Sequence, residues 1–276
     1  GLEFMQERHT YNTGIIGNCA YIAHVRTDTN ITWLCWPRFD SSFVFGAMLD
    51  EQKGGKFTVL PDGSYQSKQY YVENTNVLRT EITTEEGRYR VTDFAPRFSL
   101  YERYFKPLML IRKVEPIEGN PRIVVSCKPV YDQGKKEMQF ATGSNHLDFF
   151  GCDEQLRLST NVSLNYIESE RPFVLNETKY LILTYDHTLD APIISTAEKF
   201  LRETISYWRM WVKHSSIAGF YQPLVIRSSL VLKIHQYEDT GAIIAASTTS
   251  LPEHPGSTRN WDYRYCWLRD SYYTLT

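Results

Sequence analysis

The chain has 276 residues, a length that allows one large domain or two of ordinary size. Its formal net charge of −2 gives no electrostatic reason to expect nucleic acid or an anionic membrane as partner, and no apolar run approaches the roughly 18 residues of a membrane span. Aromatic residues make up 14% of the chain and favour a β-rich body, because aromatic side chains are enriched in strands.

Short β-type runs separated by turns fill the chain from about residue 13 to 185. Apolar and polar residues alternate in LRTEITT (residues 78–84), as is typical of a sheet with one solvated face. Turn sequences such as PDGS (61–64) and EGNP (118–121) break the runs. Many short strands without intervening helices predict a β-sandwich. GLEF before Met5 is interpreted as a cloning remnant, so the sandwich domain is assigned to residues 5–190.

The apolar period changes from two to three or four residues after Pro192. Ser195 to Glu198 match a capping box, in which the serine oxygen and the glutamate satisfy free amides at a helix start. The spacing predicts a helix over about 196–214. This helix forms a linker assigned to residues 191–217.

A second helix is expected after Gly219, with Pro223 in its first turn and its end near residue 237. It is apolar on nearly all faces, which is typical of a helix buried between neighbours. Little of the chain remains to bury it, so we expect the front portion of a longer protein. Without the missing portion, the β domain, a second copy of the chain or a separate chain that supplies the rest is expected to cover the helix. A complete protein with a small helical cap is the alternative.

The densest group of polar and aromatic residues is RNWDYRYCWLRDSYY, residues 259–273. Rings pack on the C–H faces of a pyranose, a carboxylate accepts from two adjacent hydroxyls, and arginine donates in a rigid fork. The segment therefore suits a sugar, although an aromatic core strand with a surface Arg–Asp pair is the alternative. In an extended chain one face carries four alternating rings, those of Trp261, Tyr263, Tyr265 and Trp267.

This segment resembles the signature of glycoside hydrolase family 15, which includes glucoamylases and related bacterial enzymes. TTSLPE (248–253) is similar to the family's lead-in, and IGNCAYIAHV (16–25) with ITWLCWPRFD (31–40) resembles the opening of the bacterial members. The resemblance brackets the chain. It implies a mainly β fold: an N-terminal super-β-sandwich, a helical linker, and the beginning of an (α/α)6 catalytic barrel, truncated, at residues 218–276.

The resemblance also implies which residues bind the substrate. Arg269 and Asp270 would hold a glucosyl ring in the −1 subsite, with Asp270 on its 4- and 6-hydroxyls, and Tyr263 and Trp267 would wall the same subsite. The family inverts the anomeric centre with two glutamates, a general acid and a general base, roughly 6.5–9.5 Å apart. Both belong to later barrel segments, so no catalytic residue is expected in this chain, which should be inactive alone. Glu253 matches the lead-in and is interpreted as a loop or structural glutamate.

A second aromatic and charged patch reads WLCWPRFD, residues 33–40. Two interpretations are open for it. It is either part of the active-site wall, if this loop approaches the mouth of the barrel, or a core strand that ends in a turn with Arg38 and Asp40. The second interpretation is favoured.

The remaining polar residues predict no cofactor and no metal site. The five cysteines are scattered, without C-x-x-C or metal spacing to histidine, and predict reduced, buried thiols in a cytoplasmic protein. No Gly-rich phosphate loop or serine triad is present in the sequence. Four isolated histidines are interpreted as core or surface residues: His24, His146, His187 and His235.

The sequence therefore predicts the N-terminal part of an inverting, exo-acting, glucoamylase-like hydrolase that releases glucose from non-reducing ends. An α,α-trehalase or a dextran-cleaving member of the same family is the nearest alternative, since the −1 residues recognise glucose in all of them. The expected partner is an α-glucan oligosaccharide or trehalose. A non-catalytic carbohydrate-binding β-sandwich is an alternative of another class.

Overall fold

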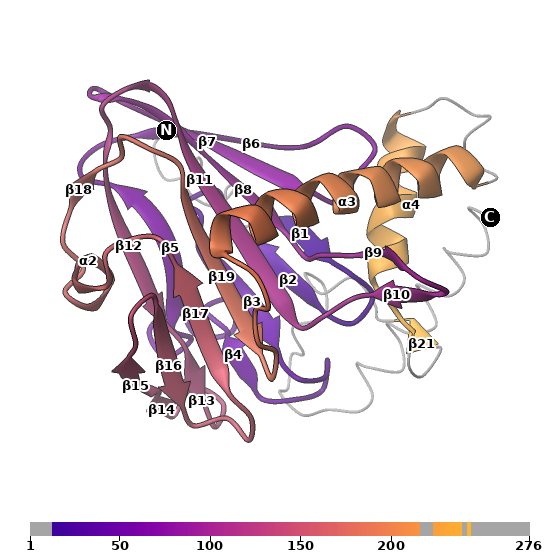
Figure 1. The fold of residues 1–276 in the computed structure, drawn as a ribbon, viewed down its shortest axis with the longest axis horizontal. Coiled ribbons are helices and arrows are strands. Elements are labelled where there is room, and N and C mark those ends of the chain that lie inside the picture. Colours follow the sequence, from indigo (N-terminus) through magenta and orange to yellow (C-terminus); the bar gives the residue numbers. More distant parts are fainter. Residues whose placement is uncertain (1–12, 216–222, 239–241, 244–276) are drawn as a thin grey trace, which may run out of the picture.

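The computed structural model describes residues 13–215, 223–238 and 242–243. The N-terminal region forms two layers of antiparallel β-sheet (Figure 1). The first layer is one eight-stranded sheet. In spatial order its strands are β15 (Gln139–Thr142), β16 (His146–Phe150), β17 (Leu156–Thr160), β19 (Lys179–Tyr185), β11 (Met109–Gly119), β8 (Gly87–Phe94), β7 (Leu78–Thr84) and β6 (Gln66–Tyr71).

The second layer combines two smaller sheets. The four-stranded sheet consists of β1 (Gly14–Gly17), β2 (Ile22–Val25), β3 (Ile31–Cys35) and β4 (Phe43–Phe45). The three-stranded sheet consists of β18 (Phe173–Val174), β12 (Arg122–Lys128) and β5 (Lys56–Pro61). The shorter elements are α2 (Leu164–Glu168), β9 (Phe98–Leu100) with β10 (Arg103–Phe105), β13 (Val130–Tyr131) with β14 (Lys136–Glu137), and β20 (Gln236–Tyr237) with β21 (Ala242–Ile243).

The main hydrophobic core lies between the two layers, because alternate side chains of each strand point inward. On β5 the inward side chains are Phe57 and Val59, both fully buried. On β7 Leu78 and Ile82 are buried in the same way, while the residues between Ile82 and the end of the strand are exposed or half-buried. The apolar side chains of the alternating patterns that predicted a sandwich therefore form its core.

A buried ion pair connects the two layers. Arg112 on β11 and Asp93 on β8 are directly opposite in register, and neither side chain is exposed. Arg112 Nε donates to Asp93 at 2.7 Å, and its two other nitrogens donate to backbone carbonyls of Phe57 (2.7 Å) and Thr29 in the second layer. Taking each ion out of water costs several kcal/mol. The buried pair is tolerated because hydrogen bonds and the opposite charge offset this cost.

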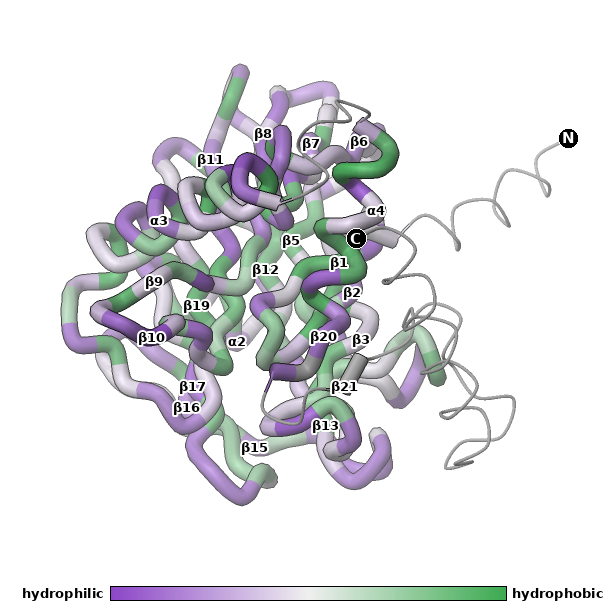
Figure 2. Tube along the Cα trace, turned by 90° about the vertical axis from the view of Figure 1, so that its right-hand side faces the viewer, coloured by the Kyte–Doolittle hydropathy of each residue, from purple (hydrophilic) through white to green (hydrophobic). Residues whose placement is uncertain are grey.

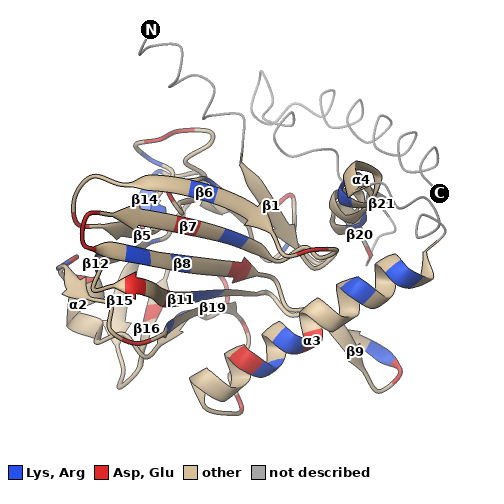
Figure 3. Ribbon diagram, turned by 90° about the horizontal axis from the view of Figure 1, so that it is seen from above, with Lys and Arg blue, Asp and Glu red and all other residues tan. Residues whose placement is uncertain are grey.

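Helix α3 (Ile193–His214) runs across the outer face of the eight-stranded sheet (Figure 1). Ala197 and Leu201 of α3 belong to a second core cluster with Phe94 and Ile182 of that sheet. Figure 3 shows acidic and basic residues along the helix, as expected for an amphipathic helix with one face in solvent.

The predicted capping box is wrong, because α3 begins at Ile193 rather than near residue 196. Pro192 occupies the N-cap position, and no side chain caps this end. Ser195 therefore lies within the first turn, where its hydroxyl donates to the carbonyl of Pro192 at 3.1 Å. Glu198 reaches instead to Lys113 of β11, at 2.8 Å. A tertiary ion pair has replaced the local contact that the sequence suggested.

Helix α4 (Pro223–Ile234) begins with the predicted proline, ends before residue 237, and packs beside β1, where both elements are hydrophobic (Figure 2). In its second half Leu230 and Ile234 are buried in a cluster with Trp208 of α3. In its first half Leu224 keeps 79% of its surface exposed. The sequence of α4 predicts a helix that is buried on nearly all faces. The described residues bury only part of it.

The mainly β region followed by helices is confirmed, and so are the strands predicted from alternating patterns. The strand predicted at FVLN has only two residues, β18, and the five-residue helix α2 was not predicted because it is too short to show a helical period. No helix in the part of the chain that the structure describes is long and apolar enough to cross a membrane.

Candidate functional site

The predicted glucose-binding residues Tyr263, Trp267, Arg269 and Asp270 lie outside the described residues, and so does Glu253. Their roles remain predictions. The structure does describe the junction that precedes this segment in the chain. There the β1–β2 turn, the connection after β8, the β9–β10 hairpin, α3 and the end of α4 meet.

Arg97 lies at the centre of this junction with 1% of its side chain exposed. Its guanidinium donates to the backbone carbonyl of Asn18 at 3.0 Å and forms a two-point ion pair with the carboxylate of Glu238. The ring centroids of Tyr104 and Tyr207 lie 4.5 and 4.9 Å from its Cζ. A buried guanidinium needs such partners because its desolvation is unfavourable. One side chain therefore joins the sandwich, α3 and the segment after α4.

The β1–β2 turn beside Arg97 is held from both sides. The side-chain amide of Asn18 donates to the carbonyls of Pro96 (3.0 Å) and Pro107 (2.8 Å). The thiol of Cys19 donates to the carbonyl of Lys233 in α4 at 3.3 Å. Burial raises the pKa of Cys19 to about 11, so the thiol stays protonated at neutral pH and keeps its hydrogen to donate. The turn thereby fixes the end of α4 against the sandwich.

Two histidines are fully buried, one on each side of this contact. His24 lies on β2, and His235 follows α4 directly with its Nδ1 2.7 Å from the carbonyl of Val231. Burial, with a smaller effect of the neighbouring His235, lowers the pKa of His24 to about 3, and burial lowers that of His235 to about 4. Both rings are neutral near pH 7. Their interpretation as core residues is confirmed.

The segment 33–40 forms the end of a core strand, as favoured from its sequence. β3 ends at Cys35, and the ring of Trp36 is buried 5.2 Å from that of Tyr21. The chain then turns outward, and Arg38 pairs with Asp40 at 3.4 Å with both side chains mostly exposed. A place for this turn in an active-site wall remains a prediction.

The described residues do not gather ligands for a metal ion. Between residues 13 and 238, apart from the gap at 216–222, no group of three or more His, Cys, Asp or Glu side chains could hold one. The four described cysteines are free; Cys19, Cys35 and Cys127 are buried and Cys152 is half-buried. Cys266 lies outside the described residues.

Two family models match the chain, one on each side of the junction between the sandwich and α4. Residues 6–171 match the family model described as trehalase-like, N-terminal, and residues 219–276 match the model of glycosyl hydrolases family 15. The chain belongs to glycosyl hydrolase family 15 and carries a trehalase-like N-terminal domain. Arg97 thus lies in the trehalase-like domain, and its partner Glu238 lies in the part that matches the hydrolase model.

Similar full-length proteins are named trehalases. The chain is 35% identical to one from Thermoplasma acidophilum over 89% of its length, 36% to one from Thermoplasma volcanium over 95%, and 29% to one from Mycolicibacterium smegmatis over 95%. It spans 43% of the length of each of these relatives. No solved structure matches it.

The junction of this family 15 chain was not predicted from its sequence. Arg97 follows a predicted strand and Glu238 follows a predicted helix, but nothing in either stretch indicates a partner 141 positions away.

Replacing Arg97 by Met should destabilise the family 15 chain by about 2–3 kcal/mol, because Glu238 loses its buried ion-pair partner and keeps only Lys106, at 3.9 Å. Urea unfolding measures this loss. The matched control is Arg38→Met, which removes an exposed ion pair with Asp40 and should cost less than about 1 kcal/mol. Equal losses in the two variants would contradict the role assigned to the junction.

Stability should fall as the pH drops below about 6.5, because the unfolded chain then binds protons at His24 and His235 while the folded chain keeps both rings neutral down to about pH 4. The fall should be about 1 kcal/mol per pH unit for each histidine. The variant carrying His24→Gln and His235→Gln should show a flatter dependence in urea unfolding between pH 6.5 and 4.5. A wild-type slope in the double variant would refute the assignment.

Proposed function

We propose that this chain is the N-terminal part of an inverting, exo-acting hydrolase of α-linked glucosides, and that its substrate is α,α-trehalose. The supporting observation is that relatives named trehalase align with 89% to 95% of the chain. This favours the trehalase alternative over the glucoamylase-like function that was predicted from the sequence. The whole protein's activity is a proposal, since the chain spans less than half of each of these relatives.

In this proposal the segment around residues 263–270 binds the glucosyl unit that is transferred to water. The carboxylate of Asp270 accepts hydrogen bonds from the 4- and 6-hydroxyls, and Arg269 donates to the same ring in a fixed geometry. Tyr263 and Trp267 pack on the ring's C–H faces. Each of these contacts orients the anomeric carbon without taking part in proton transfer.

The chemical step needs two carboxyl groups on opposite sides of the glycosidic bond. A protonated glutamate gives its proton to the leaving oxygen, while an ionised one takes a proton from the attacking water. A separation of roughly 6.5–9.5 Å leaves room for that water. We propose that both glutamates follow residue 276 in the complete barrel, so the 276-residue chain alone binds but does not hydrolyse.

The trehalase-like domain has a structural part in this scheme. The main core cluster of the sandwich draws on residues between Ile16 and Tyr185, and the junction of Arg97 with Glu238 holds the segment after α4 against it. A non-catalytic carbohydrate-binding sandwich would use the same core, but it would not need Asp270.

Asp270→Ala should lower kcat/KM for trehalose by about 10²–10⁴-fold in the protein with its complete barrel, because two charge-assisted hydrogen bonds are lost. Initial-rate assays of glucose release measure this. The matched control is Asp262→Ala, on the face of the predicted strand opposite Tyr263 and Trp267, which should retain most activity.

Two results would reject the proposal. One is unchanged activity in the Asp270→Ala variant, which would favour the non-catalytic module. The other is hydrolysis of maltose or trehalose by the purified 276-residue chain, which would mean that the acid and base lie within it.

A further inference from the structure

A groove of about 880 Å³ lies on the outer face of the β18–β12–β5 sheet, on the side of the sheet away from the main core. Its volume is in the range of about 300–1,000 Å³ that small-molecule sites occupy. The floor is the outward-facing row of β5 and β12, and the walls are the β2–β3 turn, the loop before β5 and the β13–β14 hairpin. Every residue that lines it lies between Arg26 and Glu170, so none belongs to the predicted glucose pocket.

Three neutral polar side chains on this floor have atoms available for a ligand. Thr58 and Ser126 are directly opposite on neighbouring strands, and Asn30 lies beside them, with its Oδ1 accepting from the amide of Phe57 at 2.9 Å. Asn30, Thr58 and Ser126 are only 3%, 5% and 4% exposed. No hydrogen bond recorded between described residues uses the Nδ2 of Asn30 or the hydroxyls of Thr58 and Ser126.

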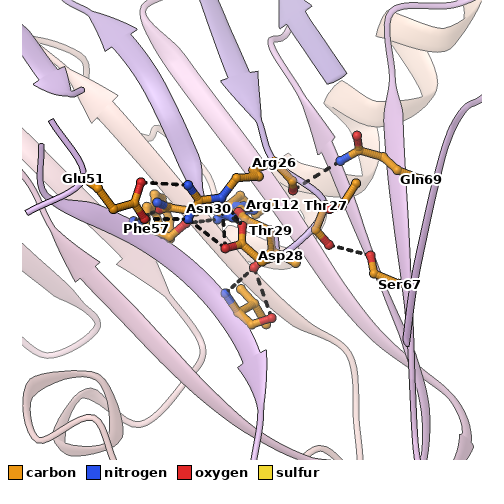
Figure 4. A network of polar contacts seen from close by, with 11 residues as sticks. Arg26, Thr27, Asp28, Thr29, Asn30, Glu51, Phe57, Ser67, Gln69 and Arg112 are labelled. Atoms are coloured by element: carbon orange, nitrogen blue, oxygen red, sulfur yellow. Dashed lines mark hydrogen bonds and ion pairs between the residues drawn. The ribbon is translucent and has the colours of Figure 1, made fainter. Parts of the chain in front are cut away.

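Six of the nine charged residues that line the groove form two sets of ion pairs. Arg26 donates to Asp28 at 2.8 Å and to Glu51 at 2.9 Å (Figure 4). At the other end of the floor, Lys56 and Lys128 hold the two oxygens of one carboxylate, that of Glu170, at 3.5 and 3.0 Å. The lining contains five basic and four acidic residues, so its charges nearly cancel. Such a groove offers fixed donors and acceptors without demanding a charged ligand.

We propose that this groove is a second saccharide-binding site, suited to an uncharged α-glucoside of two or three units. The hydroxyls of such a ligand exchange hydrogen bonds with Asn30, Thr58 and Ser126, while its C–H faces pack on Leu60 and Val124 at one end of the floor. The choice of an α-glucoside rests on the proposed function. The site itself rests only on the groove, and it would hold substrate on the trehalase-like domain without any part in the chemistry.

The test is titration of the 276-residue chain with maltotriose and with trehalose, followed by amide chemical shifts in NMR. At least one sugar should shift amides of β5 and β12. The double variant Thr58→Val, Ser126→Ala should bind that sugar at least tenfold more weakly, and Ser126→Ala alone at least threefold. Both changes keep or reduce side-chain volume, and the single variant serves if the double variant fails to fold.

Two controls separate this site from the predicted glucose pocket. Thr83→Val, the same change at an exposed position of β7, should leave binding in the groove unchanged. Asp270→Ala should leave the shifts on β5 and β12 unchanged, whatever it does to binding at the predicted glucose pocket. Binding that survives the groove variants but is lost in Asp270→Ala would overturn the proposal, as would the lack of any shift in β5 and β12 with either sugar. Loss of the proposed function appears separately, as absence of hydrolysis by the complete protein with groove binding intact.

Discussion

The buried pair of Arg112 and Asp93 is the constraint on which the sandwich depends. It lies between layers that otherwise meet through apolar side chains, and it binds the carbonyls of Phe57 and Thr29 across the gap. Close apolar packing already resists displacement of the layers, and the planar guanidinium adds directional hydrogen bonds to fixed partners on both sides. The pair therefore fixes the position of β8 and β11 in one layer relative to β5 and the β2–β3 turn in the other. The same turn carries the network of Arg26 that forms one wall of the groove (Figure 4).

A second, smaller set of contacts extends this order into the hydrolase part of the chain. Arg97 uses the same device as Arg112, a desolvated guanidinium with a carboxylate and a backbone carbonyl, but it links segments that match two different family models. Cys19 and the buried histidines lie around the same contact with α4. The polar groups of the junction are uncharged or paired at neutral pH, which suits a permanent connection rather than a moving one.

Local patterns predicted the strands and the starting proline of α4, because side-chain alternation and the geometry of proline act within a few residues. They failed where a distant partner decides the outcome. Glu198 fits a local capping box but pairs with Lys113, and nothing around Arg97 or Arg112 indicates burial. The groove was missed for the same reason, since Thr58 and Ser126 become neighbours only through the pairing of β5 with β12. The glucose-binding residues remain predictions from the motif, with Asp270 as the most specific of them.

The activity proposed for the complete protein is inverting hydrolysis of trehalose. Proton NMR of the sugar anomers during the first minutes of the reaction tests this most directly. Inversion gives equal amounts of α- and β-glucose, because water attacks one anomeric carbon from the opposite face while the leaving glucose keeps its α configuration. Release of α-glucose alone, or no cleavage of trehalose, would contradict the account.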